Sequence, residues 1–492
     1  MRRLSEEALS GLPAGVTVPG YDRTYCGVGI VHLGIGAFHR AHQAVYTDDV
    51  LAIDGGDWAI VGVSLRDAGM RERMGPQDGL YSVTVRSGGE ERQRVIGAVK
   101  GVLFGPEDPR ALLALLAAPS TRIVSLTVTE KGYCREPSSG ALLRDDPEVR
   151  RDLEHPDSPV TALGTLVRAL DLRRQGGLPP FTVLSCDNLP DNGTSLRRVA
   201  LEFAGLVSTE LAAWIEASVA FPCTMVDRIV PAMTEEALGE VAASLGCRDE
   251  AAVVTEPFTQ WVIEDHFTLG RPAWEKAGAL LVPDVAPYEV MKLRLLNGAH
   301  STLAYLGYLG GMEHIADCMA HDDLRAFIGA LLREEISPTL APPPGFDVPG
   351  YIDDLLARFA NPVLRHRTWQ IAMDGSQKLP QRLLGTILER LEDDLPIPRL
   401  TLAVAGWVRY ACGTDLAGGA IDVRDPLADL LRGRLQPVME DPEALAGAAL
   451  GVREVFGAEL GDHGPFRAAL ARGLATIAER GPLASAAMLA AP

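Results

Sequence analysis

Three polar residues on one predicted helix have the types and spacing needed for acid–base chemistry. Lys292, Asn297 and His300 lie within residues 288–303, a stretch interrupted by a single glycine. At about 100° per residue, Lys292 and His300 fall on the face that carries most of the leucines, and Asn297 falls at its edge. Burial lowers the pKa of a lysine, and a lysine that is neutral near pH ~8 can act as a general base. The alternative is a lysine that reaches solvent along its stem, beside a hydrogen-bonded core histidine.

Charged and polar neighbours on the same helix bear on that interpretation. Glu289 stands three residues before Lys292, where it could form an ion pair and keep the lysine protonated. We therefore predict a supporting role for Glu289, in gating water or relaying protons. Arg294 and Ser301 are expected on the opposite face of the helix.

A second pattern, Gly34-x-Gly36, is typical of a dinucleotide-binding turn. It follows an apolar predicted strand at 27–33 and opens a predicted helix, the context that this fingerprint requires. Residues without a Cβ let a pyrophosphate approach the amides at the helix N-terminus. His39 occupies the position of the third glycine, so an ordinary glycine-rich turn is the alternative. Arg40 could add a positive charge for the pyrophosphate or lie on a solvated helix face.

The second strand of such a domain normally ends near an acidic residue that bonds the adenosine ribose. Asp67 follows the predicted strand at 58–64 and is the candidate for that role. The neighbouring Arg66 could bind the 2′-phosphate of NADP, so NADP stays an alternative. The pattern favours NAD over NADP as the cofactor.

The elements that must position these residues divide the chain into an α/β part and a helical part. Up to about residue 285, short apolar runs alternate with amphipathic stretches, which predicts a largely parallel sheet of Rossmann type with helices on both faces. We predict a dinucleotide-binding domain at 1–285 and a mainly α-helical substrate and catalytic domain at 286–492. The expected strands are 27–33, 58–64, 81–86, 95–102, 123–128 and 181–185, and one long helix is expected at 196–218.

The composition restricts the classes of partner and the compartment. The 492 residues include 46 Lys and Arg against 65 Asp and Glu, a formal net charge of −19. That balance argues against nucleic acid and anionic membrane surfaces as partners. The seven cysteines contain no CxxC pair, and their odd number is typical of reduced thiols in a cytoplasmic protein. We expect no signal peptide, and no apolar run reaches the ~18 residues of a membrane span.

Seven segments together resemble the polyol-specific long-chain dehydrogenases, the family of mannitol 2-dehydrogenase and fructuronate reductase (D-mannonate oxidoreductase). They are spread over most of the chain, and their number and order carry the resemblance. The segments are Gly34-Ile-Gly-Ala-Phe-His-Arg-Ala-His42, Asp78-Gly-Leu-Tyr81, Thr127-Val-Thr-Glu-Lys-Gly-Tyr133, Ser185-Cys-Asp-Asn-Leu-Pro-Asp-Asn-Gly193, Met225-Val-Asp-Arg-Ile-Val-Pro231, Lys292-x4-Asn297-x2-His300 and Asp374-Gly-Ser-Gln-Lys-Leu-Pro380.

The resemblance implies an NAD-dependent oxidoreductase that interconverts a secondary alcohol and a ketone on a sugar acid or polyol. Lys292 would be the general base of a metal-independent reaction. Asn188 and Asn297 would hydrogen-bond the developing alkoxide, a role that needs fixed uncharged donors. His300 would orient the substrate beside them.

Three further residues of these segments are assigned to the site. Asp227 is expected to support it from nearby, and a structural ion pair with Arg228 is the alternative role. Phe38 and Glu130 are assigned to cofactor binding.

Three other classes of protein agree less well with the sequence: a metal-dependent enzyme, a sensor without catalysis and an enzyme with a serine nucleophile. His39 and His42 stand three residues apart, but no cysteine or carboxylate lies beside them at ligand spacing, so we expect no metal. A dinucleotide-binding sensor without catalysis would be expected to lack one of the four polar residues named above, and all four are present. No G-x-S-x-G elbow for a serine nucleophile occurs.

The segment at 366–382 bears on the substrate, because the family divides by what lies beyond the reacting carbon. It resembles the fructuronate reductase side and contains four potential cations, which could receive the carboxylate of a sugar acid. Of these we predict Arg367 and Lys378 as substrate-binding residues. D-mannonate and D-fructuronate are therefore favoured, with mannitol and fructose as the alternative, and the oligomeric state is not predicted. The four cations are His366, Arg367, Lys378 and Arg382.

Overall fold

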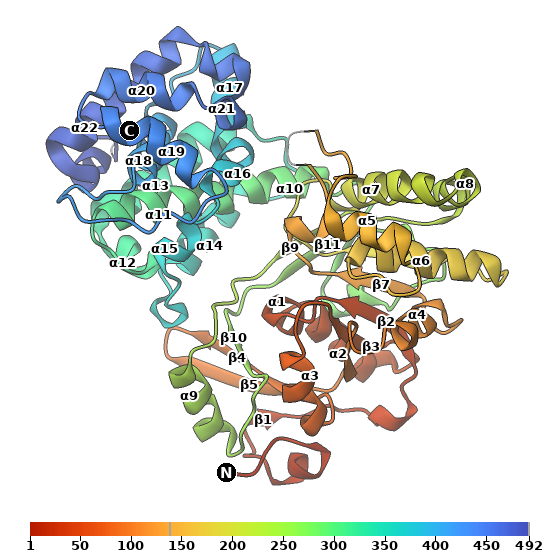
Figure 1. The fold of residues 1–492 in the computed structure, drawn as a ribbon. Helices are drawn as coiled ribbons and strands as arrows, with labels where there is room; N and C mark the ends of the chain where they lie inside the picture. The colour runs from red at the N-terminus through yellow and green to blue at the C-terminus, as the bar shows by residue number, and fades with distance from the viewer. Residues whose placement is uncertain (137–138, 491–492) are drawn as a thin grey trace. The chain divides into compact units, whose positions relative to one another are not determined.

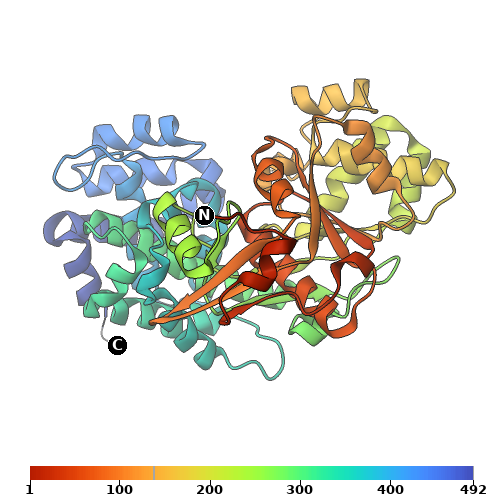
Figure 2. The same ribbon diagram turned by 90° about the horizontal axis from the view of Figure 1, so that it is seen from below.

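The computed structural model describes residues 1–136 and 139–490, which form two compact units at Met1–Ala286 and Pro287–Pro492 (Figure 1). The named strands of the described residues all lie in the first unit, and the second unit is built from helices and loops (Figure 2). The predicted fold class, a Rossmann-type α/β part followed by a mainly α-helical part, is confirmed.

A five-stranded parallel sheet with the order β6-β3-β2-β7-β8 organises the first unit. The strand order reverses between β2 and β7. In sheets of this kind, nucleotides bind at the carboxyl ends of the strands beside such a reversal. The strands are β2 (Val28–Leu33), β3 (Ala59–Ser64), β6 (Val99–Phe104), β7 (Ile123–Leu126) and β8 (Thr182–Ser185).

In the first unit, the prediction of one long helix at 196–218 was wrong. The stretch at 196–218 forms two helices, because Ser208 leaves the helical conformation (φ −163°) and its hydroxyl accepts the Leu211 N–H at 3.0 Å to start the second. The helices are α1 (Ala37–Ala41), α2 (Gln43–Asp54), α3 (Gly69–Met74), α4 (Pro109–Ala117), α5 (Pro147–Glu154), α6 (Ala162–Gln175), α7 (Asn192–Val207), α8 (Thr209–Ser218) and α9 (Glu235–Leu245).

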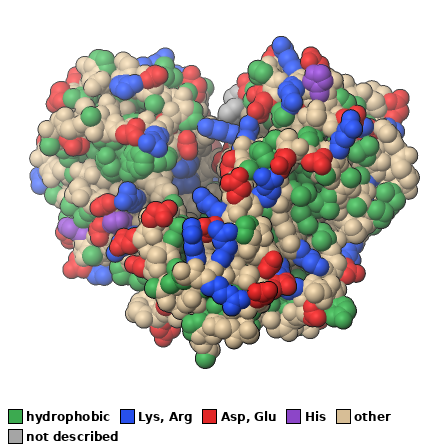
Figure 3. All heavy atoms as spheres, turned by 60° about the horizontal axis from the view of Figure 1, so that its bottom comes forward, with side chains coloured by type: hydrophobic (Ala, Val, Ile, Leu, Met, Phe, Trp, Pro, Cys, Tyr) green, Lys and Arg blue, Asp and Glu red, His purple; other side chains and the backbone are tan. Residues whose placement is uncertain are grey.

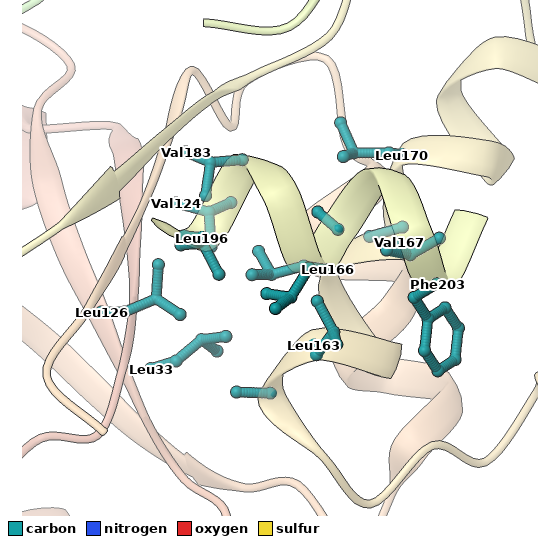
Figure 4. Packing of buried hydrophobic residues seen from close by; sticks show 14 of the residues in the cluster. Leu33, Val124, Leu126, Leu163, Leu166, Val167, Leu170, Val183, Leu196 and Phe203 are labelled. Atoms are coloured by element: carbon teal, nitrogen blue, oxygen red, sulfur yellow. The ribbon is translucent and has the colours of Figure 1, made fainter. Parts of the chain in front are cut away.

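Both faces of the parallel sheet are buried, and alternate residues of its strands enter two different cores. Val31 and Leu33 of β2 belong to a core shared with α4, α6 and α7, whereas Ile30 of the same strand belongs to the core on the other face. Figure 4 shows the first of these cores, in which Leu163 and Leu196 come from the covering helices. Because both faces are covered, the strands are continuous apolar runs in the sequence.

Two smaller sheets complete the first unit. The prediction of a single strand at 95–102 was wrong. That stretch contributes to two strands in different sheets, β5 and β6, and between them Gly97 and Ala98 donate their N–H groups to Asp48 Oδ1 at 2.8 and 3.0 Å. One sheet therefore contains the antiparallel pair β4 and β5 rather than parallel strands alone. The orders are β1-β5-β4-β10 and β12-β11-β9, with β1 (Val16–Thr17), β4 (Tyr81–Ser87), β5 (Glu90–Ile96), β9 (Thr224–Asp227), β10 (Val253–Thr255), β11 (Gln260–Glu264) and β12 (Leu280–Val282).

The second unit packs around α11, which is buried along most of its length and contacts α15, α18 and α22. In place of one uninterrupted α-helix over 288–303, the chain forms α10, a π-helical segment η6, and α11. The elements are α10 (Ala286–Lys292), η6 (Leu293–Asn297), α11 (Gly298–Leu309), α12 (Ile315–Ala320), α13 (Asp322–Ala330), η7 (Leu331–Ile336), α14 (Val348–Phe359), α15 (Thr368–Ala372), α16 (Gly375–Leu379), η10 (Pro380–Leu384), α17 (Gly385–Glu392), α18 (Pro398–Ala411), α19 (Ala428–Leu435), α20 (Pro442–Leu450), α21 (Arg453–Gly461) and α22 (Gly464–Met488).

The surface of the protein is charged and of mixed sign. Acidic and basic side chains interleave over the face drawn in Figure 3, although acidic residues outnumber basic ones in the whole chain. Within residues 1–136 and 139–490, none of the helices combines the length and the apolar character that a membrane crossing requires.

Candidate active site

The dinucleotide-type turn lies where β2 ends and α1 begins. Gly34 has φ +92°, and a Cβ built on it would lie 2.2 Å from the Thr127 carbonyl oxygen, so only glycine fits there. Gly36 is the N-cap of α1, and among the described atoms a Cβ on it would meet only the Gly34 carbonyl oxygen, at 3.8 Å. This open space gives a phosphate group access to the amides of the first helical turn. The turn therefore fits a dinucleotide.

His39, which replaces the third glycine of the fingerprint, is fully buried and stacks on His32. The ring centroids are 3.4 Å apart and the planes differ by 12°. The two ring nitrogens of His32 lie 2.8 Å from Ser125 Oγ and 2.9 Å from Thr127 Oγ1. Thr127 Oγ1 also donates to the Gly34 carbonyl oxygen at 2.7 Å. The histidine pair is therefore part of the scaffold that holds the glycine-rich turn.

Burial of this histidine pair predicts that the fold is sensitive to acid. Desolvation lowers the pKa of His32 to about 3 and holds the pKa of His39 well below its usual range. Between about pH 6.5 and pH 3, these two histidines therefore bind protons in the unfolded state but not in the folded state. This contribution to stability is complete above about pH 6.5 and is lost as the pH falls, by up to about 1.4 kcal/mol per pH unit for each histidine.

Asp187 acts in the opposite direction, because burial raises its pKa to about 6 and the folded state binds its proton first. Because Asp187 is present in the wild type and in every variant, its contribution to the pH dependence of stability cancels when they are compared. When the pH is lowered from 7 to 5, the free energy of unfolding, measured in urea, should fall less in His39→Leu than in the wild type. The matched variant His155→Asn, at an exposed position, should lose as much as the wild type. An equal loss in His39→Leu and wild type would contradict the prediction.

Arg40 and Phe38, two of the predicted cofactor residues, have other partners in the structure. Arg40 is 5 % exposed, and its Nη1 donates to the Ile35 carbonyl oxygen at 2.9 Å. Burial lowers the pKa of Arg40 to about 10. Phe38 is half-buried and stacks on His42, with the ring centroids 5.0 Å apart. Contacts of Arg40 and Phe38 with a cofactor stay predictions.

The other predicted cofactor residues follow strands of the same parallel sheet. Asp67 lies beyond β3, is exposed, and accepts the Gly69 N–H on Oδ1 at 2.9 Å. Arg66 makes a bidentate ion pair with Glu148, at 2.8 and 3.1 Å. Glu130 is exposed beyond the end of β7. Because the carboxyl ends of parallel strands share one edge of the sheet, Asp67 and Glu130 lie along the same edge as the glycine-rich turn.

Asn188 lies at this edge too, exposed beyond β8, and its buried neighbour Asp187 was missed by the sequence analysis. The Asp187 carboxylate accepts the N–H groups of Val128 and Thr129 at 3.1 and 2.8 Å, and the Tyr133 hydroxyl at 3.0 Å. These bonds tie the segment after β7 to the segment after β8, and so position Asn188. In the sequence, the signal was only an acidic residue beside the predicted asparagine.

Asp227 ends β9 and is 3 % exposed. Its neighbour Arg228 directs its guanidinium to backbone carbonyl oxygens, Nη1 to Ala41 at 2.5 Å and Nη2 to Glu256 at 3.0 Å. A supporting role for Asp227 stays a prediction.

In the second unit, the predicted base and its polar neighbours lie along α10, η6 and α11. Lys292, Asn297 and His300 are 6, 6 and 7 % exposed. Among the described residues, Asn297 Nδ2 and His300 Nε2 have no hydrogen-bond partner. A buried polar atom without a partner costs roughly 1–3 kcal/mol, so a ligand oxygen that bonded these two atoms would recover that free energy. Glu289 is half-buried on α10, one turn before Lys292.

His300 lies among aromatic rings and basic side chains. Its ring centroid is 4.5 Å from that of Phe359 and 5.3 Å from that of His366. Desolvation, with a smaller contribution from nearby basic groups, holds the pKa of His300 well below its usual range, and desolvation lowers the pKa of His366 to about 4. Both rings are therefore neutral at pH 7. The basic groups near His300 are His366, Arg382, Arg358 and Lys378.

The two predicted substrate-binding cations differ in position. Lys378, near His300, is half-buried, and its Nζ donates to the carbonyl oxygens of Ile371 and Met373 at 3.3 and 2.5 Å. The Arg367 side chain is 60 % exposed, and its guanidinium lies 3.6 Å from the Glu313 carboxylate. The structure therefore places Lys378 beside the other polar residues of the second unit and Arg367 at the surface.

Within residues 1–136 and 139–490, no group of three or more His, Cys, Asp or Glu side chains is arranged to hold a metal ion. His42 Nε2 lies 2.8 Å from the Gln260 carbonyl oxygen, and His39 stacks on His32 as described above.

Comparisons with known proteins cover both units. The mannitol dehydrogenase Rossmann domain matches residues 28–276, and the mannitol dehydrogenase C-terminal domain matches residues 284–478. The chain is 47 % identical over 477 residues to the D-mannonate oxidoreductase of Escherichia coli K12, covering 96 % of this chain and 97 % of that protein. It is 42 % identical over 445 residues to the mannitol 2-dehydrogenase of Cereibacter sphaeroides, covering 90 % and 92 %.

A solved structure gives the same result. The Pseudomonas fluorescens mannitol 2-dehydrogenase, in a ternary complex with NAD and D-mannitol, matches with a TM-score of 0.91 and 38 % identity over 99 % of each chain. The matches therefore include the glycine-rich turn and the helical stretch of Lys292. The chain belongs to the mannitol dehydrogenase family of oxidoreductases, which act on CH–OH groups.

Proposed function

We propose that this protein is an NAD-dependent, metal-independent oxidoreductase that interconverts D-mannonate and D-fructuronate, with Lys292 as the general base. The observation that carries the proposal is the occurrence of buried Lys292, Asn297 and His300 on one helical stretch. Asn297 Nδ2 and His300 Nε2 have no partner among the described residues. Oxygen atoms of a polyhydroxylated substrate would satisfy both.

The proposed chemistry at the reacting carbon uses groups of this chain. In the oxidative direction, Lys292 takes the proton of the secondary hydroxyl. The amides of Asn188 and Asn297 donate hydrogen bonds to the oxygen on which negative charge develops. His300, neutral in its buried environment, orients a neighbouring hydroxyl. Bound NAD supplies the hydride acceptor, C4 of its nicotinamide.

The preference for NAD over NADP rests on two neighbouring residues. Asp67 is exposed beyond β3, where a carboxylate accepts bonds from ribose hydroxyls and repels a 2′-phosphate. Arg66 is paired with the Glu148 carboxylate, which offsets its charge. The Pseudomonas fluorescens relative was solved with NAD. The seven cysteines are free and buried, which supports our proposal of a cytoplasmic location.

The choice of a sugar acid rests on the basic groups beside His300. A carboxylate beyond the reacting carbon would be stabilised by Lys378, whereas a neutral polyol would make no use of its charge. The Escherichia coli relative named D-mannonate oxidoreductase agrees with this choice. Oxidation of D-mannitol to fructose is the alternative, in line with the relatives named mannitol 2-dehydrogenase. A dinucleotide-binding sensor without catalytic activity is a second and more remote alternative.

NADH consumption with D-fructuronate and D-fructose in parallel at pH 7 tests the substrate. We expect kcat/KM to be at least about tenfold higher for D-fructuronate, because a hydrogen bond to a charged group contributes roughly 1.5–3 kcal/mol. A preference for D-fructose would make this a mannitol dehydrogenase. Binding of NADH without turnover of either sugar would support the sensor. EDTA should leave the rate unchanged, and a loss of activity would overturn the lysine mechanism.

The same assay locates the carboxylate. Lys378→Met should reduce the ratio of the two kcat/KM values by about tenfold, whereas damage to the fold would lower both values alike and leave the ratio unchanged. If the ratio falls in Arg367→Met and not in Lys378→Met, the carboxylate binds at Arg367 instead.

A further inference from the structure

The helical stretch at 286–309 changes its hydrogen-bond pattern immediately after Lys292. The segment η6 is π-helical, and the N–H of Gly298 bonds to the Leu293 carbonyl oxygen, five residues back. Single π turns inside α-helices are rare, and many of them lie at functional sites. The segments η7 and η10 are π-helical too, and η6 is the one that lies between Lys292 and His300.

The π turn changes which side chains share a face of the helix. In an α-helix, residues five apart differ by about 140° around the axis. A π turn bonds residue i to residue i+5 and brings them close to the same side. Lys292 immediately precedes η6 and Asn297 is its last residue, five positions later, so the turn moves Asn297 from the edge of the leucine-bearing face toward Lys292. His300 follows three residues later, as a neighbour of Asn297 on the surface of the helix.

Arg382 of η10 contacts the helix at the end of this turn and in the first residues of α11. Arg382 Nη1 donates to Ser301 Oγ at 2.9 Å and to the Asn297 carbonyl oxygen at 3.4 Å. Gly298 packs so closely on η10 that an added Cβ would lie 3.0 Å from the Arg382 carbonyl oxygen. Ser301 is fully buried, although helical periodicity placed it opposite the face that carries most of the leucines. Ser301 therefore contacts the side chain of Arg382, and Gly298 packs against its backbone.

We propose that Arg382 is a positioning residue, whose bonds to Ser301 and to the Asn297 backbone stabilise the π turn and so hold the Asn297 amide beside Lys292. The inference rests on the proposed function, because the position of Asn297 matters only if it and Lys292 act on the substrate. It assigns one of the four cations of 366–382 to the helix, where the sequence suggested a substrate carboxylate.

Ser301→Ala and Arg382→Met test the proposal, because the first removes the hydrogen bond and leaves the charge in place. Both should lower kcat by about 10- to 100-fold with D-fructuronate and with D-fructose alike, the size expected for a small misplacement of a catalytic group. KM and the Kd for NADH should stay within about threefold of wild type. The double variant should be no worse than Arg382→Met alone, because both changes remove one interaction. Arg382→Lys, which keeps a donor, should recover part of kcat.

Crystal structures of the two variants give a readout that does not depend on activity. In Arg382→Met the Gly298 N–H should bond to the Arg294 carbonyl oxygen, four residues back, as in an uninterrupted α-helix. The matched control is Arg333→Met, which removes an arginine of η7 that pairs with Asp353 at 2.5 Å at the surface. This control should keep the wild-type kcat and the π turn.

Four results would overturn the inference or separate it from the proposed function. If Ser301→Ala keeps wild-type kcat and Arg382→Met lowers only the rate with D-fructuronate, Arg382 binds the carboxylate. If both variants keep the π turn and the wild-type kcat, Arg382 positions nothing. If Lys292→Ala retains its activity, the proposed function itself fails, whereas an inactive Lys292→Ala beside normal Arg382 variants refutes the positioning role alone.

Discussion

Lys292→Ala is expected to lower kcat/KM by at least about 100-fold and by up to about 10⁴-fold, the contribution typical of a general base. The Kd for NAD should stay nearly unchanged, because the glycine-rich turn at 34–36 belongs to the first unit and Lys292 to the second. Steady-state oxidation of D-mannonate and D-mannitol measures the first quantity. Quenching of protein fluorescence on titration with NADH measures the binding of the cofactor.

Two additions make this result specific to the base. A small primary amine added to Lys292→Ala should restore part of the rate, because it can take the proton that the missing side chain took. The control is Lys276→Ala, which removes an exposed lysine paired with Asp54 at 2.7 and 2.9 Å and should keep wild-type kinetics. If Lys292→Ala retains more than about a tenth of the activity, the lysine is not the base.

Asn297→Leu is expected to lower kcat by about 10²- to 10³-fold, the effect of removing one donor to a developing oxyanion. The fold should not be weakened by the same change. Asn297 Nδ2 has no partner among the described residues, and replacing such an atom by an apolar group removes a cost of roughly 1–3 kcal/mol. The free energy of unfolding, measured in urea, should therefore equal or exceed that of the wild type.

The combination of lost activity with kept stability distinguishes a functional amide from a structural one. A loss of stability in Asn297→Leu with kcat near the wild-type value would show that the amide supports the fold only. Asn297→Asp adds a sharper comparison, because a carboxylate at this position repels the alkoxide and should reduce kcat at least as much. The exposed Gln436→Ala serves as the control for both measurements.

The arrangement of strands and helices in the first unit followed from local sequence patterns. Continuous apolar runs predicted β2, β3, β7 and β8 within a few residues, because strands buried on both faces have no polar side. The pattern failed at 95–102, where the break at Gly97 and Ala98 depends on the distant carboxylate of Asp48. It also failed at Ser208, whose extended backbone ends α7 and whose hydroxyl caps the start of α8.

The helical stretch of Lys292 shows the same limit in the second unit. Periodicity indicated that Lys292 and His300 are buried, and both are. The π turn and the burial of Ser301 were not predicted, because one additional residue in a helix that is apolar on most sides leaves the hydrophobic pattern almost unchanged. The contact of Ser301 with Arg382, 81 residues later in the chain, is one that no local pattern could indicate.

The sequence by itself determined the family, the fold class and the residue types of the proposed chemistry, since general bases, amide donors and glycine-rich turns depend on residue identity at short spacing. Only the tertiary structure decided how those residues are held. The stack of His39 on His32, the bonds of Asp187 to the segment after β7, and the contact of Arg382 with Ser301 all join residues from separate elements. Such contacts form only when packing brings distant segments together, and no local pattern encodes them.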